Sequence, residues 1–133
     1  MDIEVPISPG ELIDKMTILE IKLVKIKDSR KLVTVKNELK ILSAAFVSLM
    51  KRHKPEKAEV LELKKKLFIV NRKLWNIENV IRSLEAKKDF GTRFVEHARK
   101  VYITNDKRSA IKLRINALLG SGISEVKEYS RYR

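Results

Sequence analysis

Cysteine is absent from this chain of 133 residues, and histidine, proline and glycine are scarce. The lack of cysteine excludes a disulfide scaffold and thiolate metal ligands. The two histidines, His53 and His97, have no carboxylate pair at ligand spacing, so we expect no metal site. Four glycines and three prolines are far below average usage. This scarcity of helix breakers favours long helices.

Recognisable catalytic motifs are absent as well. The sequence has no glycine-rich phosphate loop, no nucleophile elbow and no Ser/His/Asp set, so we assign no catalytic residue and expect no cofactor. No apolar run approaches the roughly 18 residues that span a bilayer. The acidic start at residues 1–4 is unlike a signal peptide. We therefore expect a cytoplasmic protein without membrane insertion.

What the sequence does contain is helical periodicity. Eight apolar residues follow one another at alternating steps of three and four, which is a heptad pattern. This pattern predicts a long helix over residues 55–88 that buries one narrow stripe against another helix. The eight residues are Val60, Leu63, Leu67, Val70, Leu74, Ile77, Ile81 and Leu84.

Three further helices are predicted over residues 9–27, 30–53 and 92–119. Ser8 and Pro9 form a helix start, and the residues at 28–30 and 89–91 are typical of short turns. Short connections favour antiparallel neighbours. Residues 1–122 are therefore expected to form one all-α domain, either a four-helix antiparallel bundle or two coiled-coil-like helical hairpins. Residues 123–133 form a basic tail, and residues 2–7 are compatible with a short terminal strand pair with 123–129.

Three sequence blocks resemble a known family. They are Pro9-Gly10-Glu11-Leu12-Ile13-Asp14-Lys15 with Thr17-Ile18-Leu19-Glu20-Ile21-Lys22, then Leu74-Trp75-x-Ile77-Glu78-x-x-Ile81-Arg82, and Ala98-Arg99-x-Val101-Tyr102-x-x-Asn105-Asp106-x-Arg108. The blocks are similar to a family of small, uncharacterised helical proteins of bacteria and phages. The resemblance implies a soluble, mostly helical protein, and it implies no activity, cofactor or site residue.

Most of the positive charge lies in the second part of the chain. Of the net charge of +13, residues 51–133 carry +12 (22 basic and 10 acidic side chains), whereas residues 1–50 carry +1 (8 basic and 7 acidic). A field of this sign attracts nucleic acid, anionic lipid or an acidic protein. The other interpretation is that scattered basic side chains only keep a helical protein soluble.

Polar and aromatic residues form a second stripe beside the heptad pattern. In a hairpin that turns at 89–91, residues whose numbers sum to about 180 lie opposite one another. The stripe then has two interpretations. In one it lines a cleft for a small anionic ligand or an enzymatic site. In the other its polar residues fix the helix register, a role expected of Asn71, Glu78 and Asn105. The candidate ligand-binding residues are Trp75, Glu78, Arg82, Tyr102, Asn105, Arg108 and Lys112.

The favoured functional hypothesis is a non-catalytic helical binding or assembly protein whose basic second hairpin meets an acidic partner. The partner is expected to be a protein, which can be either a different protein or a second copy of this chain. The alternative is sequence-independent binding of nucleic acid, although no nucleic-acid motif is visible. Its candidate phosphate contacts are Lys64, Lys65, Lys66, Arg72, Lys73, Arg99 and Lys100.

Overall fold

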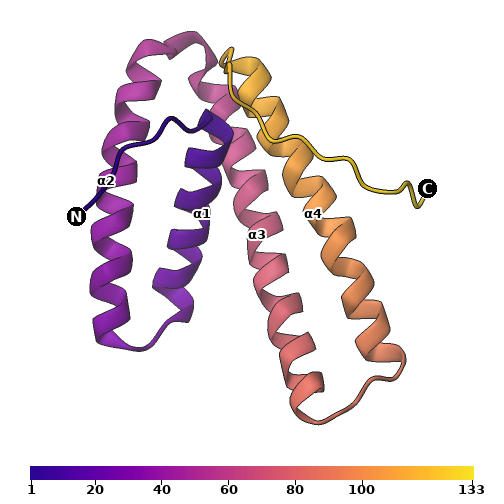
Figure 1. Ribbon diagram of the computed structural model, residues 1–133. Coiled ribbons are helices and arrows are strands. Elements are labelled where there is room, and N and C mark those ends of the chain that lie inside the picture. The colour runs from indigo at the N-terminus through magenta and orange to yellow at the C-terminus, as the bar shows by residue number, and fades with distance from the viewer.

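The computed structural model describes all 133 residues and is all-helical (Figure 1). The helices are α1 (Pro9–Lys25), α2 (Ser29–Arg52), α3 (Lys57–Ala86) and α4 (Thr92–Leu118), with a short 3₁₀ turn η1 (Lys54–Glu56) before α3. The prediction of four helices is confirmed, and each boundary lies within two residues of the predicted one. Residues 55 and 56, which we predicted at the start of the third helix, belong instead to the separate turn η1.

Side-chain caps explain two of the helix starts. The Oγ atom of Ser8 accepts a hydrogen bond from the backbone N–H of Glu11 at 3.1 Å, and Pro9 occupies the first turn of α1. At the start of α2, Oδ1 of Asp28 accepts from the backbone N–H groups of Arg30 (2.8 Å) and Lys31 (3.2 Å). These bonds satisfy N–H groups that have no partner within the helix.

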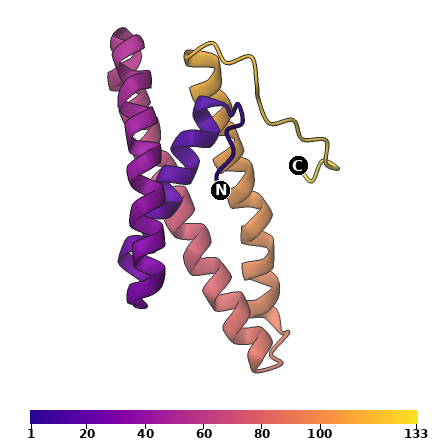
Figure 2. The ribbon, with the colours of Figure 1, turned by 60° about the vertical axis from the view of Figure 1, so that its left-hand side comes forward.

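The four helices form two antiparallel hairpins, α1–α2 and α3–α4 (Figure 1). Helix α1 contacts each of the other three helices, whereas α2 packs mainly on α1. Figures 1 and 2 both place α2 and α4 on opposite sides of the molecule. The α3–α4 hairpin reaches beyond the loop between α1 and α2. Helix α1 is therefore the central element of the fold.

The main apolar core lies where the two hairpins converge. It joins seven buried residues from all four helices and the end of α4: Ile13, Met50, Val60, Leu63, Leu67, Ile115 and Leu119. None of the eight residues of the predicted heptad stripe is exposed. The first three of them, however, pack in this core with α1 and α4 together. The start of the stripe is therefore part of a multi-helix core rather than a two-helix seam.

The terminal strand pair that residues 2–7 and 123–129 allowed is not formed, because the structure contains no strand. A strand requires a neighbouring backbone roughly 4.8 Å away along its length. In Figure 1 the N-terminal segment and the C-terminal tail instead lead toward opposite sides of the molecule. Because the two segments diverge, residues 2–7 have no neighbouring segment with which to form a strand pair, although their polarity alternates.

Gly10 allows the start of α1 to approach α4 closely. A Cβ atom at Gly10 would lie 2.6 Å from the carbonyl oxygen of Lys112 and 2.8 Å from Oδ1 of Asn116. The backbone N–H of Gly10 donates to this Asn116 oxygen at 2.8 Å. A side chain at position 10 would therefore separate two helices that are joined by a buried hydrogen bond.

We predict that Gly10→Ala lowers the free energy of unfolding by about 1–3 kcal/mol, as overpacking does in a rigid interface. In an unhindered helix the same change would be favourable by roughly 0.5–1 kcal/mol. Urea unfolding followed by circular dichroism measures the difference. Gly122→Ala is the control, since no atom lies within 4 Å of its added Cβ. Equal stability of the two variants would contradict the close approach.

Candidate functional site

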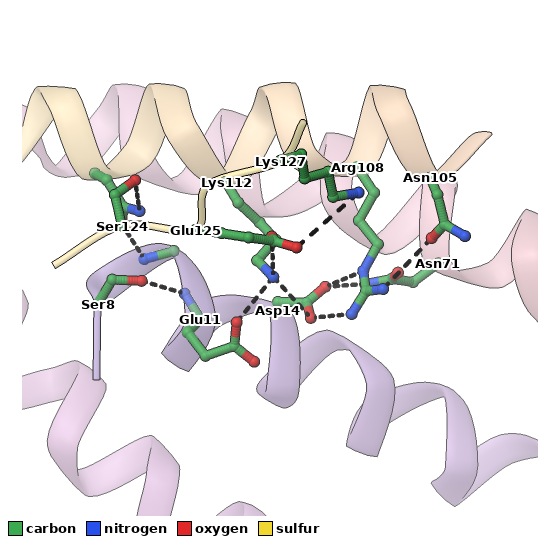
Figure 3. A network of polar contacts seen from close by, with 12 residues as sticks. Ser8, Glu11, Asp14, Asn71, Asn105, Arg108, Lys112, Ser124, Glu125 and Lys127 are labelled. Carbon is green, nitrogen blue, oxygen red and sulfur yellow. Dashed lines mark hydrogen bonds and ion pairs between the residues drawn. The ribbon is translucent and has the colours of Figure 1, made fainter. Parts of the chain in front are cut away.

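The polar centre of the molecule is the carboxylate of Asp14 on α1, whose exposed fraction is 1% (Figure 3). Asn71 of α3 donates from Nδ2 to Asp14 Oδ1 at 2.8 Å, and Arg108 of α4 donates from Nε to the same oxygen at 2.9 Å. The Nη2 atom of Arg108 also donates to Asp14 Oδ2. One carboxylate therefore joins three helices.

Thr17 completes the surroundings of this carboxylate. Its hydroxyl oxygen accepts a hydrogen bond from Asn71 Nδ2 at 2.9 Å and donates to the backbone carbonyl of Asp14 at 2.8 Å. Thr17 and Asn71 are 0% and 5% exposed. The burial of a polar group costs free energy unless the group is hydrogen-bonded, and each of these groups has a hydrogen-bond partner.

The ionisation of the three charged residues follows from these contacts. Burial alone would raise the pKa of Asp14, but hydrogen bonds from Arg108 and Asn71 and the positive charges of Arg108 and Lys112 outweigh it and lower that pKa. The hydrogen bond to Asp14 raises the pKa of Arg108 against the effect of burial. The pKa of Lys112 is also raised, because its carboxylate partners outweigh the cost of burial. All three residues are charged at neutral pH.

Lys112 extends the network toward the C-terminal tail (Figure 3). Its Nζ atom lies 2.8 Å from Glu11 Oε2, 3.1 Å from Glu125 Oε2 and 3.9 Å from Asp14 Oδ2. Next to it, Asn116 Nδ2 donates to Ser124 Oγ at 3.3 Å. These contacts hold the first part of the tail against α4.

Helical spacing explains why these residues meet. On α4, Asn105, Arg108, Lys112 and Asn116 follow one another at steps of three and four and so share one face. The sequence identified Asn105, Arg108 and Lys112 of this face as candidates, but not their main partner, Asp14. The available signal was a carboxylate within the apolar stripe of the first helix. Glu11, Thr17, Ser124 and Glu125 were missed as well, and no local pattern points to the last two.

A cleft lies beside this network, between α1, α3 and α4. Its volume is about 450 Å³, and it is bounded on the α1 side by Ile18 and Ile21. Five of the seven candidate ligand-binding residues line it: Trp75, Glu78, Arg82, Asn105 and Arg108. The predicted register thus brings Trp75 and Asn105 together in one cleft. Asn71 and Asn79 complete its polar side.

The other two candidate residues lie outside the cleft. Lys112 is 6% exposed, and its ammonium group is occupied by the carboxylates described above. The ring of Tyr102 instead contacts that of Tyr132 in the tail, with centroids 5.1 Å apart. The side chain of Tyr102 therefore faces the tail.

The seven candidate phosphate contacts do not act as one set of free charges. Lys64 Nζ lies 2.7 Å from Glu20 Oε1, and Lys65 Nζ lies 3.4 Å from Glu62 Oε1, so both are paired. The guanidinium of Arg72 lies over the ring of Phe68, 5.7 Å from its centroid. The remaining residues of this set are exposed and have no carboxylate partner: Lys66, Lys73, Arg99 and Lys100.

Two further structural properties bear on function. No three histidine, cysteine or carboxylate side chains come together as metal ligands would. None of the helices has an apolar stretch long enough to cross a membrane.

Residues 2–132 match a family of unknown function, DUF6165. The chain belongs to this family. No curated protein matches the chain, and no solved structure does. Because the DUF6165 match covers nearly all residues, it includes the buried network, the cleft and most of the tail.

We predict that Asp14→Asn lowers the free energy of unfolding by about 2–4 kcal/mol, because Arg108 and Lys112 lose a buried anion. The loss is below that of a fully buried pair, since the Arg108 side chain is 28% exposed. Urea unfolding at neutral pH measures it. The control is Glu20→Gln, which breaks the partly exposed pair with Lys64 and should cost at most about 1 kcal/mol. Equal losses would argue against a central role of Asp14.

The lowered pKa of Asp14 also predicts a pH dependence. Because the folded-state pKa lies below the ordinary value of 3.8, Asp14 stabilises the fold fully above that value. Its contribution is lost as the pH falls from 3.8 toward the lower folded-state pKa. The stability difference between wild type and Asp14→Asn should therefore shrink on acidification. A difference that stays constant across a pH series of urea unfolding experiments would contradict this assignment.

Proposed function

We propose that this protein is a non-catalytic binding protein whose basic α3–α4 hairpin docks on an acidic protein. The observation that carries the proposal is the charge of this hairpin. Residues 57–118 contain 16 basic and 7 acidic side chains, a net charge of +9. A surface of this sign attracts and orients acidic partners.

Most of this positive charge is not neutralised within the molecule. Ten basic side chains of the hairpin are exposed and have no carboxylate within 4.0 Å. The ten are Lys57, Lys66, Arg72, Lys73, Lys87, Lys88, Arg93, Arg99, Lys100 and Lys107. A second copy of the chain would bring like charges together on this surface, which disfavours self-association through it. The proposed partner is therefore a different protein.

A shallow hollow between α3 and α4 supports a protein partner over nucleic acid. Its volume is about 310 Å³, and it combines Arg72, Lys73 and His97 with apolar side chains that include Ile69 and Val80. Ile69 is 56% exposed. Protein interfaces combine apolar and charged contacts, whereas a phosphate backbone is bound mainly by charge and hydrogen bonds. The hollow therefore suits an acidic segment with apolar side chains.

The test is affinity purification from the native host, with and without nuclease treatment. We predict that the wild-type chain retains an acidic protein after nuclease treatment. The double variant Arg72→Glu/Lys73→Glu should lose that protein, with at least a roughly tenfold drop in binding once the partner is identified. Binding of the purified pair, measured by titration calorimetry, gives this value.

The matched control is Lys36→Glu/Lys40→Glu, which changes the net charge equally on exposed residues of α2. It should bind the partner within about twofold of wild type, because distant exposed charges are screened at physiological salt. An equal loss of partner binding in both variants would mean that only the net charge of the protein matters, and it would refute a defined docking surface. Retention that disappears with nuclease would support the nucleic-acid alternative instead.

A further inference from the structure

The cleft between α1, α3 and α4 has the size and shape of a small-molecule site. Its volume of about 450 Å³ falls within the range of roughly 300–1,000 Å³ for ligand pockets. One side is apolar, with Ile18 and Ile21 of α1. The opposite side carries the indole of Trp75, which is half-buried. An aromatic face at a cleft offers a flat contact surface.

Amide groups provide the polar contacts of this cleft. Asn79 is exposed and makes no hydrogen bond to another residue through its side chain. The amide oxygen of Asn105 receives only a long contact of 3.5 Å from Arg108 Nη1, and its NH₂ group is free. An amide both donates and accepts, so these two side chains can bind hydroxyl groups in either role.

The charges around the cleft are balanced, in contrast to the rest of the hairpin. Arg108 is paired with Asp14, and Arg82 Nε lies 3.7 Å from Glu78 Oε2. No cation of the cleft is therefore without a carboxylate partner. An anionic ligand, which the sequence led us to expect, would be opposed by these two carboxylates. A neutral ligand would meet no such repulsion.

We propose that this cleft binds a neutral saccharide. The apolar C–H face of a sugar ring can stack on the indole of Trp75, while its hydroxyl groups bond to Asn79, Asn105 and the Glu78–Arg82 pair. Asn71 and Arg108 also line the cleft, and their hydrogen bonds to Asp14 hold them in place before any ligand arrives. Such preorganisation reduces the entropy lost on binding.

The test uses the intrinsic fluorescence of the full chain, because Trp75 is its only tryptophan. The probes are glucose, galactose, N-acetylglucosamine and maltose, with inorganic phosphate and citrate as anions. We expect a saturable change in Trp75 emission with at least one saccharide at millimolar concentration. Phosphate and citrate should give no more change than sodium chloride of equal ionic strength. A response to the anions alone, or to none of the probes, would overturn the proposal.

A matched pair of variants locates the response. Asn79 and Asn76 are both exposed on α3, but Asn79 lines the cleft and Asn76 lines the hollow on the other side of the helix. Asn79→Ala should weaken saccharide binding by about tenfold, the value of one good hydrogen bond, and Asn76→Ala by less than about twofold. Equal effects of the two variants would refute the site.

This inference is independent of the docking surface proposed above. Arg72→Glu/Lys73→Glu should leave the saccharide response unchanged, because neither residue lines the cleft. Loss of the response in Asn79→Ala and loss of the acidic partner in the double variant are therefore separate outcomes. A saccharide response that also vanished in the double variant would contradict the separation of the two surfaces and the location of this site.

Discussion

The fold depends on the burial of one carboxylate, that of Asp14, at an exposed fraction of 1%. An ionised carboxylate loses its hydration there, and only cations and donors at short range can offset that cost. Arg108 and Asn71 provide them from two different helices. Because Asn71 and Arg108 must both reach this one carboxylate, the position of Asp14 fixes the register of α1 against α3 and α4 together. This requirement explains why α1 contacts both helices of the second hairpin.

The same requirement explains where the molecule is closed and where it is open. At the start of α1, Gly10 lets this helix approach α4, and buried apolar residues of all four helices form the core. Toward its end at Lys25, α1 diverges from α3 (Figure 1). The cleft is lined by residues of α1, α3 and α4, and Asn71 and Arg108 are among them. Residues that stabilise the fold therefore also form part of the candidate site.

The sequence predicts local features well because their causes are local. The helix start at Ser8 and the heptad spacing of α3 depend on residues a few positions apart, and these elements are confirmed. The buried network depends on pairs separated by 57 and 94 residues, which no periodicity encodes. Arg108 and Lys112 could be placed on one face of their helix. Their carboxylate partners could be identified only when α1 and the tail were placed beside that face.

Helix α3 shows how one element serves three different surfaces. Its heptad residues are buried or half-buried, and Trp75, Glu78, Asn79 and Arg82 line the cleft. Ile69, Arg72, Lys73 and Asn76 face the hollow on the side without α1. The arginines of the cleft are paired with carboxylates, whereas Arg72 and Lys73 are not. Because the cations of the cleft are paired and Arg72 and Lys73 of the hollow are not, the two surfaces support two different proposals, a neutral ligand for the cleft and an acidic partner for the hollow. Two faces of one helix can therefore differ in charge because their local ion pairs differ.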